Sequence, residues 1–321
     1  MIAITMGDGN GVGPEILLKA YQQGELSGEY MVWGDRAVLE YCNSRLGYGV
    51  DFHFAKDEKD YCPDKLNVLD LGFLTREDLT PGKVNAKVAA ASREYVVRAS
   101  QMALEGKFSA VVTLPVNKEA IRLTDPGFTG HTELIAGICG QSHYTMMLAS
   151  KALTVTHVST HVSMEESIRN CKKDRILEVI RLTWDALARF QEHPVIAVAG
   201  LNPHAGENGA FGTQEISDIA PAVQAAREEG MDVVGPLPPD TVFLRAYRGE
   251  FGAVVCMYHD QGHIPMKLLD FEGGVNVSLG LKVVRTSVDH GTAYDIAYQG
   301  KAKTGSLAAA YDYAVKIQNR S

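Results

Sequence analysis

The sequence predicts an α/β fold built on parallel strands. Short apolar runs that are typical of buried strands alternate with amphipathic helical patterns along the 321-residue chain. A chain of this length can bury a large core and is long for one domain, so we expect two lobes. Polar and glycine-rich segments follow several predicted strands, which is where α/β proteins carry their functional loops.

Composition narrows the class of protein. Apolar residues make up 45% of the chain, and the formal net charge of −8 argues against nucleic acid or an acidic membrane as a partner. No apolar run approaches the ~20 residues of a membrane span, and the N-terminus is too polar for a signal peptide. The five cysteines form no CxxC pair, so we interpret them as core thiols. We therefore expect a cytoplasmic protein.

The N-terminal strand, Met1–Met6, leads into the glycine-rich stretch GDGNGVGPE. Its glycines allow a tight turn, and Pro14 suits the first position of a helix. Such a turn can present backbone N–H groups to an anion. The spacing is neither the GxGxxG dinucleotide fingerprint nor a P-loop. An active-site role and a purely structural turn both remain open here.

The elements that follow continue the alternation. The apolar pattern from Val84 to Glu105 predicts a long helix, and Ala110–Thr113 predicts a strand. Lys118 comes at the start of another helix. In the segment GHTE, we expect Thr132 to cap a helix and His131 to point outward from its N-terminus, a suitable place to bind an anion.

The second half of the chain repeats this pattern. Tyr144–Ala149 and Ala152–Val158 predict a hairpin, and an apolar stripe predicts a helix from Lys173 to about Glu192. Further strands are predicted at Pro194–Ala199, Met231–Val234, Ala253–Met257, Val275–Leu279 and Val283–Arg285. We expect polar loops between the last three of these strands.

Three histidines each come just after a predicted strand: His161, His204 and His259. Three imidazoles are a common protein contribution to a catalytic divalent metal. Any one of them alone is more typical of a surface loop, and their spacing is not a compact motif. Lys267, Asn276 and Arg285, close to the third histidine in sequence, are suited to holding a phosphate or carboxylate.

The motifs together resemble those of the 4-hydroxythreonine-4-phosphate dehydrogenase family of vitamin B6 biosynthesis. The resemblance rests on GHTE, STHVSM, GLNPHAGENGAFGTQEI, GPLPPDT, YHDQGHIP, GGVNVSLGL and RTSVDHGTAYDIA, in this order over nearly the whole chain. Two motifs depart from the family pattern: GDGNGVGPE replaces its usual GDPAGIGPE, and LPVNK replaces its GPVHK. HGTAYDIA also resembles the adenine-side loop of isocitrate and isopropylmalate dehydrogenases.

The resemblance implies an isocitrate/isopropylmalate dehydrogenase-like fold, with the active site in the cleft between two α/β/α lobes. We place the lobes at residues 1–128 with 275–321, and 129–274. It also implies a homodimer with a shared active site, in which His259 is contributed across the interface.

The same resemblance implies the roles of the site residues. The divalent metal (Zn, Mg, Mn or Co) would be bound by His161, His204 and His259. The substrate would be bound by His131, Thr132, Lys267, Asn276 and Arg285. Lys267 would handle the proton, with Asp240 and Asp260 as further catalytic residues close by. NAD would be bound by Ser287, Asp289, His290, Gly291, Thr292, Ala293 and Asp295.

The expected reaction is NAD-linked oxidation and decarboxylation of a phosphorylated 3-hydroxy acid. Related alternatives are a D-threonate or D-erythronate 4-phosphate dehydrogenase of sugar acid catabolism, to which YHDQGHIP is closer, and a dehydrogenase of cis-dihydrodiol dicarboxylates. Two alternatives from other classes are a phosphotransacetylase-like acyl transferase, which needs neither metal nor NAD, and a catalytically silent phosphometabolite-binding protein.

Overall fold

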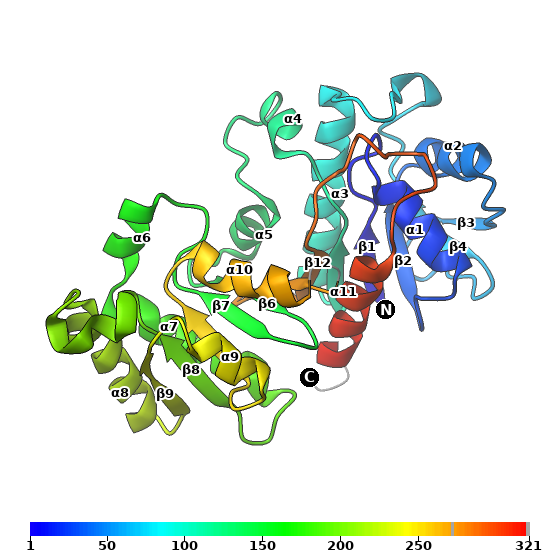
Figure 1. The fold of residues 1–321 in the computed structure, drawn as a ribbon. Helices are drawn as coiled ribbons and strands as arrows, with labels where there is room; N and C mark the ends of the chain where they lie inside the picture. Colours follow the sequence, from blue (N-terminus) through cyan, green and yellow to red (C-terminus); the bar gives the residue numbers. More distant parts are fainter. Residues whose placement is uncertain (271–272, 319–321) are drawn as a thin grey trace. The chain divides into compact units, whose positions relative to one another are not determined.

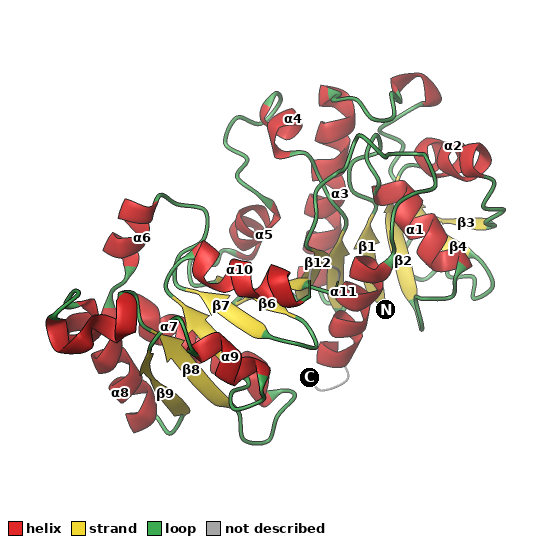
Figure 2. Ribbon diagram, viewed as in Figure 1, coloured by secondary structure: helices red, strands yellow, loops and turns green. Residues whose placement is uncertain are grey.

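The computed structural model describes residues 1–270 and 273–318, which divide into two compact units (Figures 1 and 2). Of the described residues, the first unit comprises 1–142 and 281–318, and the second comprises 143–270 and 273–280. The division predicted from sequence was at 128/129 and 274/275. Both units combine helices with a sheet, so the predicted α/β class is confirmed.

The first unit is built on six parallel strands, which lie in the order β3-β4-β2-β1-β5-β12. The strands are β1 (Ile2–Thr5), β2 (Tyr30–Gly34), β3 (Phe52–Ala55), β4 (Leu66–Asp70), β5 (Ala110–Thr113) and β12 (Arg285–Val288). The helices are α1 (Gly13–Gln22), α2 (Arg36–Leu46), α3 (Ala86–Leu104), α4 (Lys118–Arg122), α5 (His131–Cys139) and α11 (Gly305–Gln318), with a short turn η1 (Arg76–Asp78). Helix α3 confirms the long helix that was predicted from Val84 to Glu105.

The second unit has the strand order β11-β6-β7-β10-β8-β9. Its strands are β6 (Thr145–Ala149), β7 (Thr154–His157), β8 (Val195–Ala199), β9 (Asp232–Leu237), β10 (Ala253–Cys256) and β11 (Val275–Leu279). Its helices are α6 (Met164–Asn170), α7 (Lys173–Ala188), α8 (Ala220–Glu228), α9 (Val242–Tyr247) and α10 (His259–Leu269), with short helices η2 (Pro203–Gly209) and η3 (Glu215–Ile219). The predicted hairpin β6–β7 is confirmed as antiparallel.

Successive side chains of β10 point to opposite faces of this sheet, and helices cover both faces. Ala253 and Val255 belong to one apolar cluster with residues of α7 and α8, whereas Val254 and Cys256 belong to another with residues of α9 and α10. A strand buried on both faces reads as a continuous apolar run, and AVVCM does. The second unit is therefore a three-layer α/β/α sandwich.

Two elements near the end of the chain differ from the prediction. The segment after Met257 was predicted to be a loop, but it forms helix α10 despite Gly262 and Pro265 within it. Gly262 is required by packing, because a Cβ there would lie 2.6 Å from His157 Nε2. The strand predicted at Val283–Arg285 instead begins at Arg285 and continues to Val288. The prediction ended too early because Thr286 and Ser287, although buried, are polar and interrupt the apolar pattern.

Four of the five cysteines are buried, and Cys62 is half-buried; all five are free thiols. Burial raises the pKa of the Cys171 thiol to about 12, which suits a core residue rather than a nucleophile. No helix among the described residues is long and apolar enough to cross a membrane.

Candidate functional site

The three predicted metal ligands follow three neighbouring strands of the second unit. His161 comes after β7, His204 after β8 and His259 after β10. Strand β10 lies between β7 and β8, parallel to both, so the carboxyl ends of the three strands lie at one edge of the sheet. The ring centroids of His161 and His259 are 5.5 Å apart. The ring of His204 instead lies beside Phe211, at 6.2 Å.

One face of α10 carries three functional side chains at a spacing of four residues: His259, His263 and Lys267. The rings of His259 and His263 are stacked, with centroids 3.6 Å apart. The carboxylate of Asp260 lies 2.7 Å from His259 Nδ1. A carboxylate on one ring nitrogen fixes the orientation of the imidazole and leaves Nε2 for a ligand, as behind many metal-bound histidines.

His263 also contacts a histidine of β7, His157, which was not predicted as a site residue. His157 is fully buried, and its Nε2 lies 3.2 Å from His263 Nδ1. Burial lowers the pKa of His157 to about 3 and that of His263 to about 4, and the charges of neighbouring histidines act in the same direction. The sequence did contain a signal for this arrangement, because residues 259, 263 and 267 are four apart and would share one face of a helix. The signal was overlooked because this segment was predicted to be a loop.

The imidazoles of His161 and His259 are chemically suited to bind a divalent cation, because a histidine whose second ring nitrogen contacts a carboxylate is a typical metal ligand. Within residues 1–270 and 273–318, however, no group of three or more His, Cys, Asp or Glu side chains is arranged to hold a metal ion. His161 and His259 of one chain could therefore supply part of a ligand set, which a further donor must complete.

The segment that carries His204 has an unusual backbone. Five successive residues, 204–208, have φ between 44° and 79°, the left-handed region. The carboxylate of Glu215, only 3% exposed, accepts hydrogen bonds from the backbone N–H groups of Leu201 (2.8 Å) and Asn202 (2.7 Å). Glu215 was not predicted as a functional residue, because its burial and its partners in a preceding loop are not visible in the sequence.

The remaining predicted residues of the second unit come from a turn, from α10 and from β11. Asp240 is exposed in the turn between β9 and α9, and Lys267 is exposed on α10. Asn276 lies on β11, with its Nδ2 2.9 Å from Met146 Sδ.

The first unit brings together three residues that were predicted to bind the substrate, His131, Thr132 and Arg285, with Thr113 and Lys118, which were not. We call these five residues the Arg285 cluster. The Arg285 side chain is buried, and its guanidinium donates to Thr113 Oγ1 at 2.8 and 3.2 Å and to Thr132 Oγ1 at 3.4 Å. Burial lowers the pKa of Arg285 to about 10, while the charge of Glu133 acts in the opposite direction. At neutral pH the cluster therefore holds a buried cation beside the N-terminus of α5.

His131 and Thr132 differ from their predicted roles at this helix terminus. The N-cap residue of α5 is Gly130, without a side-chain cap, so Thr132 is not the cap and its hydroxyl accepts from Arg285. His131 does not point outward: its Nε2 is buried and has no hydrogen-bond partner among the described residues. Burial lowers the pKa of His131 well below its usual value, and the charges of Arg285 and Lys118 lower it further. A neutral imidazole here is available to a ligand.

The predicted NAD segment also lies in the first unit, from the end of β12 into the loop that follows. Ser287 is buried in the strand, whereas His290, Gly291 and Asp295 are exposed. An ideal Cβ at Gly291 would meet no atom within 4 Å, so the backbone there is open to a ligand. These features fit a cofactor that approaches the main chain closely.

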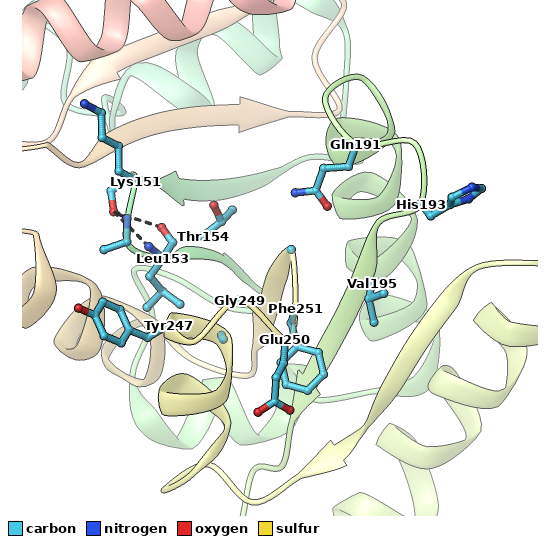
Figure 3. Close-up of a pocket in the computed structure, with 14 residues that line it drawn as sticks. Lys151, Leu153, Thr154, Gln191, His193, Val195, Tyr247, Gly249, Glu250 and Phe251 are labelled. Atoms are coloured by element: carbon cyan, nitrogen blue, oxygen red, sulfur yellow. Dashed lines mark hydrogen bonds between the residues drawn. The ribbon is translucent and has the colours of Figure 1, made fainter.

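A cavity of about 500 Å³ in the second unit contains none of the predicted site residues (Figure 3). It is lined by segments 150–154, 191–195 and 246–252, which precede or begin β7, β8 and β10. Because these strands are parallel, the cavity lies at the opposite edge of the sheet from His161 and His259.

Comparison with known proteins connects this geometry to a family. Residues 27–314 match the family described as pyridoxal phosphate biosynthetic protein PdxA. The chain is 42% identical to the D-threonate 4-phosphate dehydrogenase of Pectobacterium atrosepticum (99% of both chains) and 43% identical to the 4-hydroxythreonine-4-phosphate dehydrogenase of Beijerinckia indica (99% and 95%). A crystal structure of the 4-hydroxythreonine-4-phosphate dehydrogenase of Klebsiella pneumoniae has a TM-score of 0.88 at 41% identity, over 99% of both chains. The predicted resemblance is confirmed, and the chain belongs to the PdxA family.

Proposed function

We propose that the chain is a cytoplasmic, metal- and NAD-dependent dehydrogenase of the 4-hydroxythreonine-4-phosphate dehydrogenase type. It would oxidise a hydroxyl group of a phosphorylated 3-hydroxy acid, whose product then loses CO₂. The observation that carries the proposal is the Arg285 cluster, found in a chain that shares its family and its fold with such dehydrogenases.

The Arg285 cluster has the chemistry of an anion site. A buried guanidinium forms strong, directed hydrogen bonds to phosphate or carboxylate oxygens. Thr113 and Thr132 hold its orientation, and the N-terminus of α5 adds a partial positive charge. His131 contributes a buried Nε2 that a substrate oxygen could engage. We propose that this cluster binds an anionic group of the substrate.

The histidines and Lys267 of the second unit, together with the predicted NAD segment of the first, would supply the remaining chemistry. A divalent cation, when bound, would polarise the substrate hydroxyl and stabilise the negative charge that develops during decarboxylation. Bound NAD would accept the hydride. Asp260 holds the ring of His259 in position for ligation. Lys267, further along the same helix face, is the residue we propose to handle the proton. For Asn276 we propose a contact with the substrate and for Asp240 a place near the reacting atoms.

We also propose a homodimer that completes the metal ligands. The exposed face of α10 carries Ile264 and Leu268, which are 64% and 83% exposed, immediately beside the face that holds His259 and His263. Large apolar side chains exposed next to an incomplete ligand set are suited to contact with a second copy of the chain. The resemblance implies that His259 crosses the interface, but its contact with His161 favours His204 as the ligand that crosses.

A second candidate substrate is D-threonate 4-phosphate, because relatives with that name are as similar to this chain as those named for 4-hydroxythreonine 4-phosphate. Both compounds carry a carboxylate and a 4-phosphate, and they differ chiefly in an amino or a hydroxyl group beside the carboxylate. The Arg285 cluster would serve either substrate.

The deciding experiment is NADH formation in the presence of Mg²⁺, Mn²⁺, Co²⁺ or Zn²⁺ with each of the two substrates. Turnover of either one that depends on added metal supports the proposed reaction and identifies the substrate. Arg285→Lys keeps the positive charge but loses the planar guanidinium, which can donate two parallel hydrogen bonds to one anionic group. We therefore expect KM for the phosphorylated substrate to rise by about tenfold or more. Absence of NADH with both substrates and all four metals would contradict the proposal.

A further inference from the structure

The predicted NAD segment and the residues just after it are hydrogen-bonded to the glycine-rich N-terminal loop. Val12 N–H donates to Thr292 O at 2.9 Å, and the Tyr298 hydroxyl donates to Gly9 O at 2.6 Å. The approach is close enough to require glycine at position 11, where a Cβ would lie 2.9 Å from Thr292 O. The N-terminal turn, for which sequence analysis left two roles open, therefore acts as a support for this segment.

The hydroxyl of Tyr294 lies at the centre of this support. It donates to Asp8 Oδ2 at 2.8 Å. Asp8 is only 1% exposed, and its other carboxylate oxygen accepts from Asn10 N–H at 2.9 Å. A buried carboxylate needs such partners, because burial alone raises the pKa of Asp8. Neither Asp8 nor Tyr294 has an assigned part in the proposed reaction.

We propose that Tyr294 is a positioning residue, which through Asp8 fixes segment 289–295 in the conformation that binds the nicotinamide cofactor. The inference rests on the proposed function, since it presumes that this segment binds NAD. A loop that is ordered before binding loses less conformational entropy when the ligand arrives. Removing the hydroxyl should therefore weaken cofactor binding without altering groups that touch the substrate.

The test is the NADH dissociation constant of Tyr294→Phe, measured by NADH fluorescence on the metal-loaded full chain. Loss of the hydroxyl is expected to raise that constant by about tenfold, the effect of one charge-assisted hydrogen bond. KM for NAD should rise by a similar factor, while KM for the phosphorylated substrate stays within about twofold of wild type. An unchanged NADH dissociation constant would overturn the inference.

The chain offers a matched control. The Tyr95 hydroxyl donates to Asp35 Oδ2 at 2.5 Å, another tyrosine bond to a buried aspartate in the same unit, outside segment 289–295. Tyr95→Phe should destabilise the fold comparably and leave NADH affinity unchanged; an equal loss of NADH affinity in both variants would overturn the inference.

A conservative pair tests the hydrogen bond itself. Asp8→Asn keeps an acceptor for Tyr294 and should bind NADH more tightly than Asp8→Ala, and equal weakening in the two would count against positioning through this bond. If the wild-type protein binds no NADH, the proposed function fails. If it does and Tyr294→Phe binds NADH equally well, only this inference fails.

Discussion

The rings of His161 and His259 lie 5.5 Å apart within one chain, one after β7 and the other after β10. These strands are direct parallel neighbours, so their carboxyl ends are adjacent and the two histidines that follow them lie close together. His204 leaves the same edge after β8, but the chain then turns through the left-handed segment 204–208, and its ring lies beside Phe211. Of the three predicted ligands, His161 and His259 therefore form a pair, and His204 lies beside Phe211 instead.

Mixed dimers should reveal this pairing. If His161 and His259 act in one chain and His204 crosses to the partner, a hybrid of His204→Ala and His259→Ala subunits keeps one intact site. We expect such hybrids to recover about half of the wild-type activity, while each parent dimer is inactive. Hybrids of His161→Ala and His259→Ala should stay inactive, because each subunit then lacks one of the pair.

Activity and bound metal in purified hybrids carrying two different affinity tags check this prediction. Recovery in both hybrids would show that His259 is the residue that crosses, as the family resemblance implies, whereas recovery in the His161/His259 hybrid alone would show that His161 crosses. Recovery in neither hybrid, with stable dimers, would contradict a shared site.

Asn10→Ala should affect stability rather than substrate choice. Asn10 differs from the alanine usual in the family, but its side chain contacts the chain near residue 80: it accepts from Thr80 N–H at 2.8 Å and donates to Lys83 O at 3.1 Å. Asn10 is fully buried. Removing these bonds should lower the free energy of unfolding by about 1–3 kcal/mol. Urea unfolding measures the loss, and a changed preference between the two candidate substrates would contradict the assignment.

The positions of the histidines could be predicted from the sequence because strand ends depend on local apolar runs. The apolar runs of β7, β8 and β10 end just before the polar segments that carry His161, His204 and His259. Helix α10 could not be predicted, because Gly262 and Pro265 oppose a helix locally. Its formation depends on packing against β7 and β10, which the local pattern does not contain.

Long-range partners account for most of what remained hidden. The role of Asn10 depends on Thr80, and that of Tyr294 depends on Asp8, which is 286 positions away in the chain. The sequence shows a polar residue in each case but not which atom will face it. Arg285 could be predicted to bind an anion from its residue type and its place near His259, but not its partners Thr113 and Thr132, which come from distant segments.

The stability of the protein should depend on pH through His131. Burial, with the charges of Arg285 and Lys118, lowers the pKa of His131 well below 6.5 in the folded state. As the pH falls below about 6.5, the unfolded chain binds a proton at this position and the folded chain does not. Each pH unit below that value should therefore cost the wild type up to about 1.4 kcal/mol relative to His131→Asn.

The measurement is urea unfolding of both proteins from pH 8 to pH 5. The difference between them at pH 8, where the imidazole is neutral in both states, gives the effect of the substitution on packing. A difference that stays constant down to pH 5 would show that His131 is protonated equally in the folded and unfolded states.

Glu215 should hold the His204 segment in its left-handed conformation. Each non-glycine residue in that region costs about 1–2 kcal/mol, and four of the five successive residues are not glycine. The Glu215 carboxylate offsets part of this cost through the N–H groups of Leu201 and Asn202 and the Asn202 side chain, with oxygen to nitrogen distances of 2.7–2.8 Å. Glu215→Gln keeps the size of the side chain but turns one acceptor into a donor. We expect it to lower the free energy of unfolding by about 1–3 kcal/mol.

Hydrogen exchange of residues 200–212 separates a local effect from a general one. In Glu215→Gln the amides of Leu201 and Asn202 should exchange faster, while those of β8 keep their protection. Glu192→Gln, which alters an exposed acidic residue before the same strand, serves as the control and should leave both regions unchanged. If exchange at Leu201 and Asn202 is the same in both variants, Glu215 does not hold the segment, and the left-handed run must be maintained by contacts of its own residues.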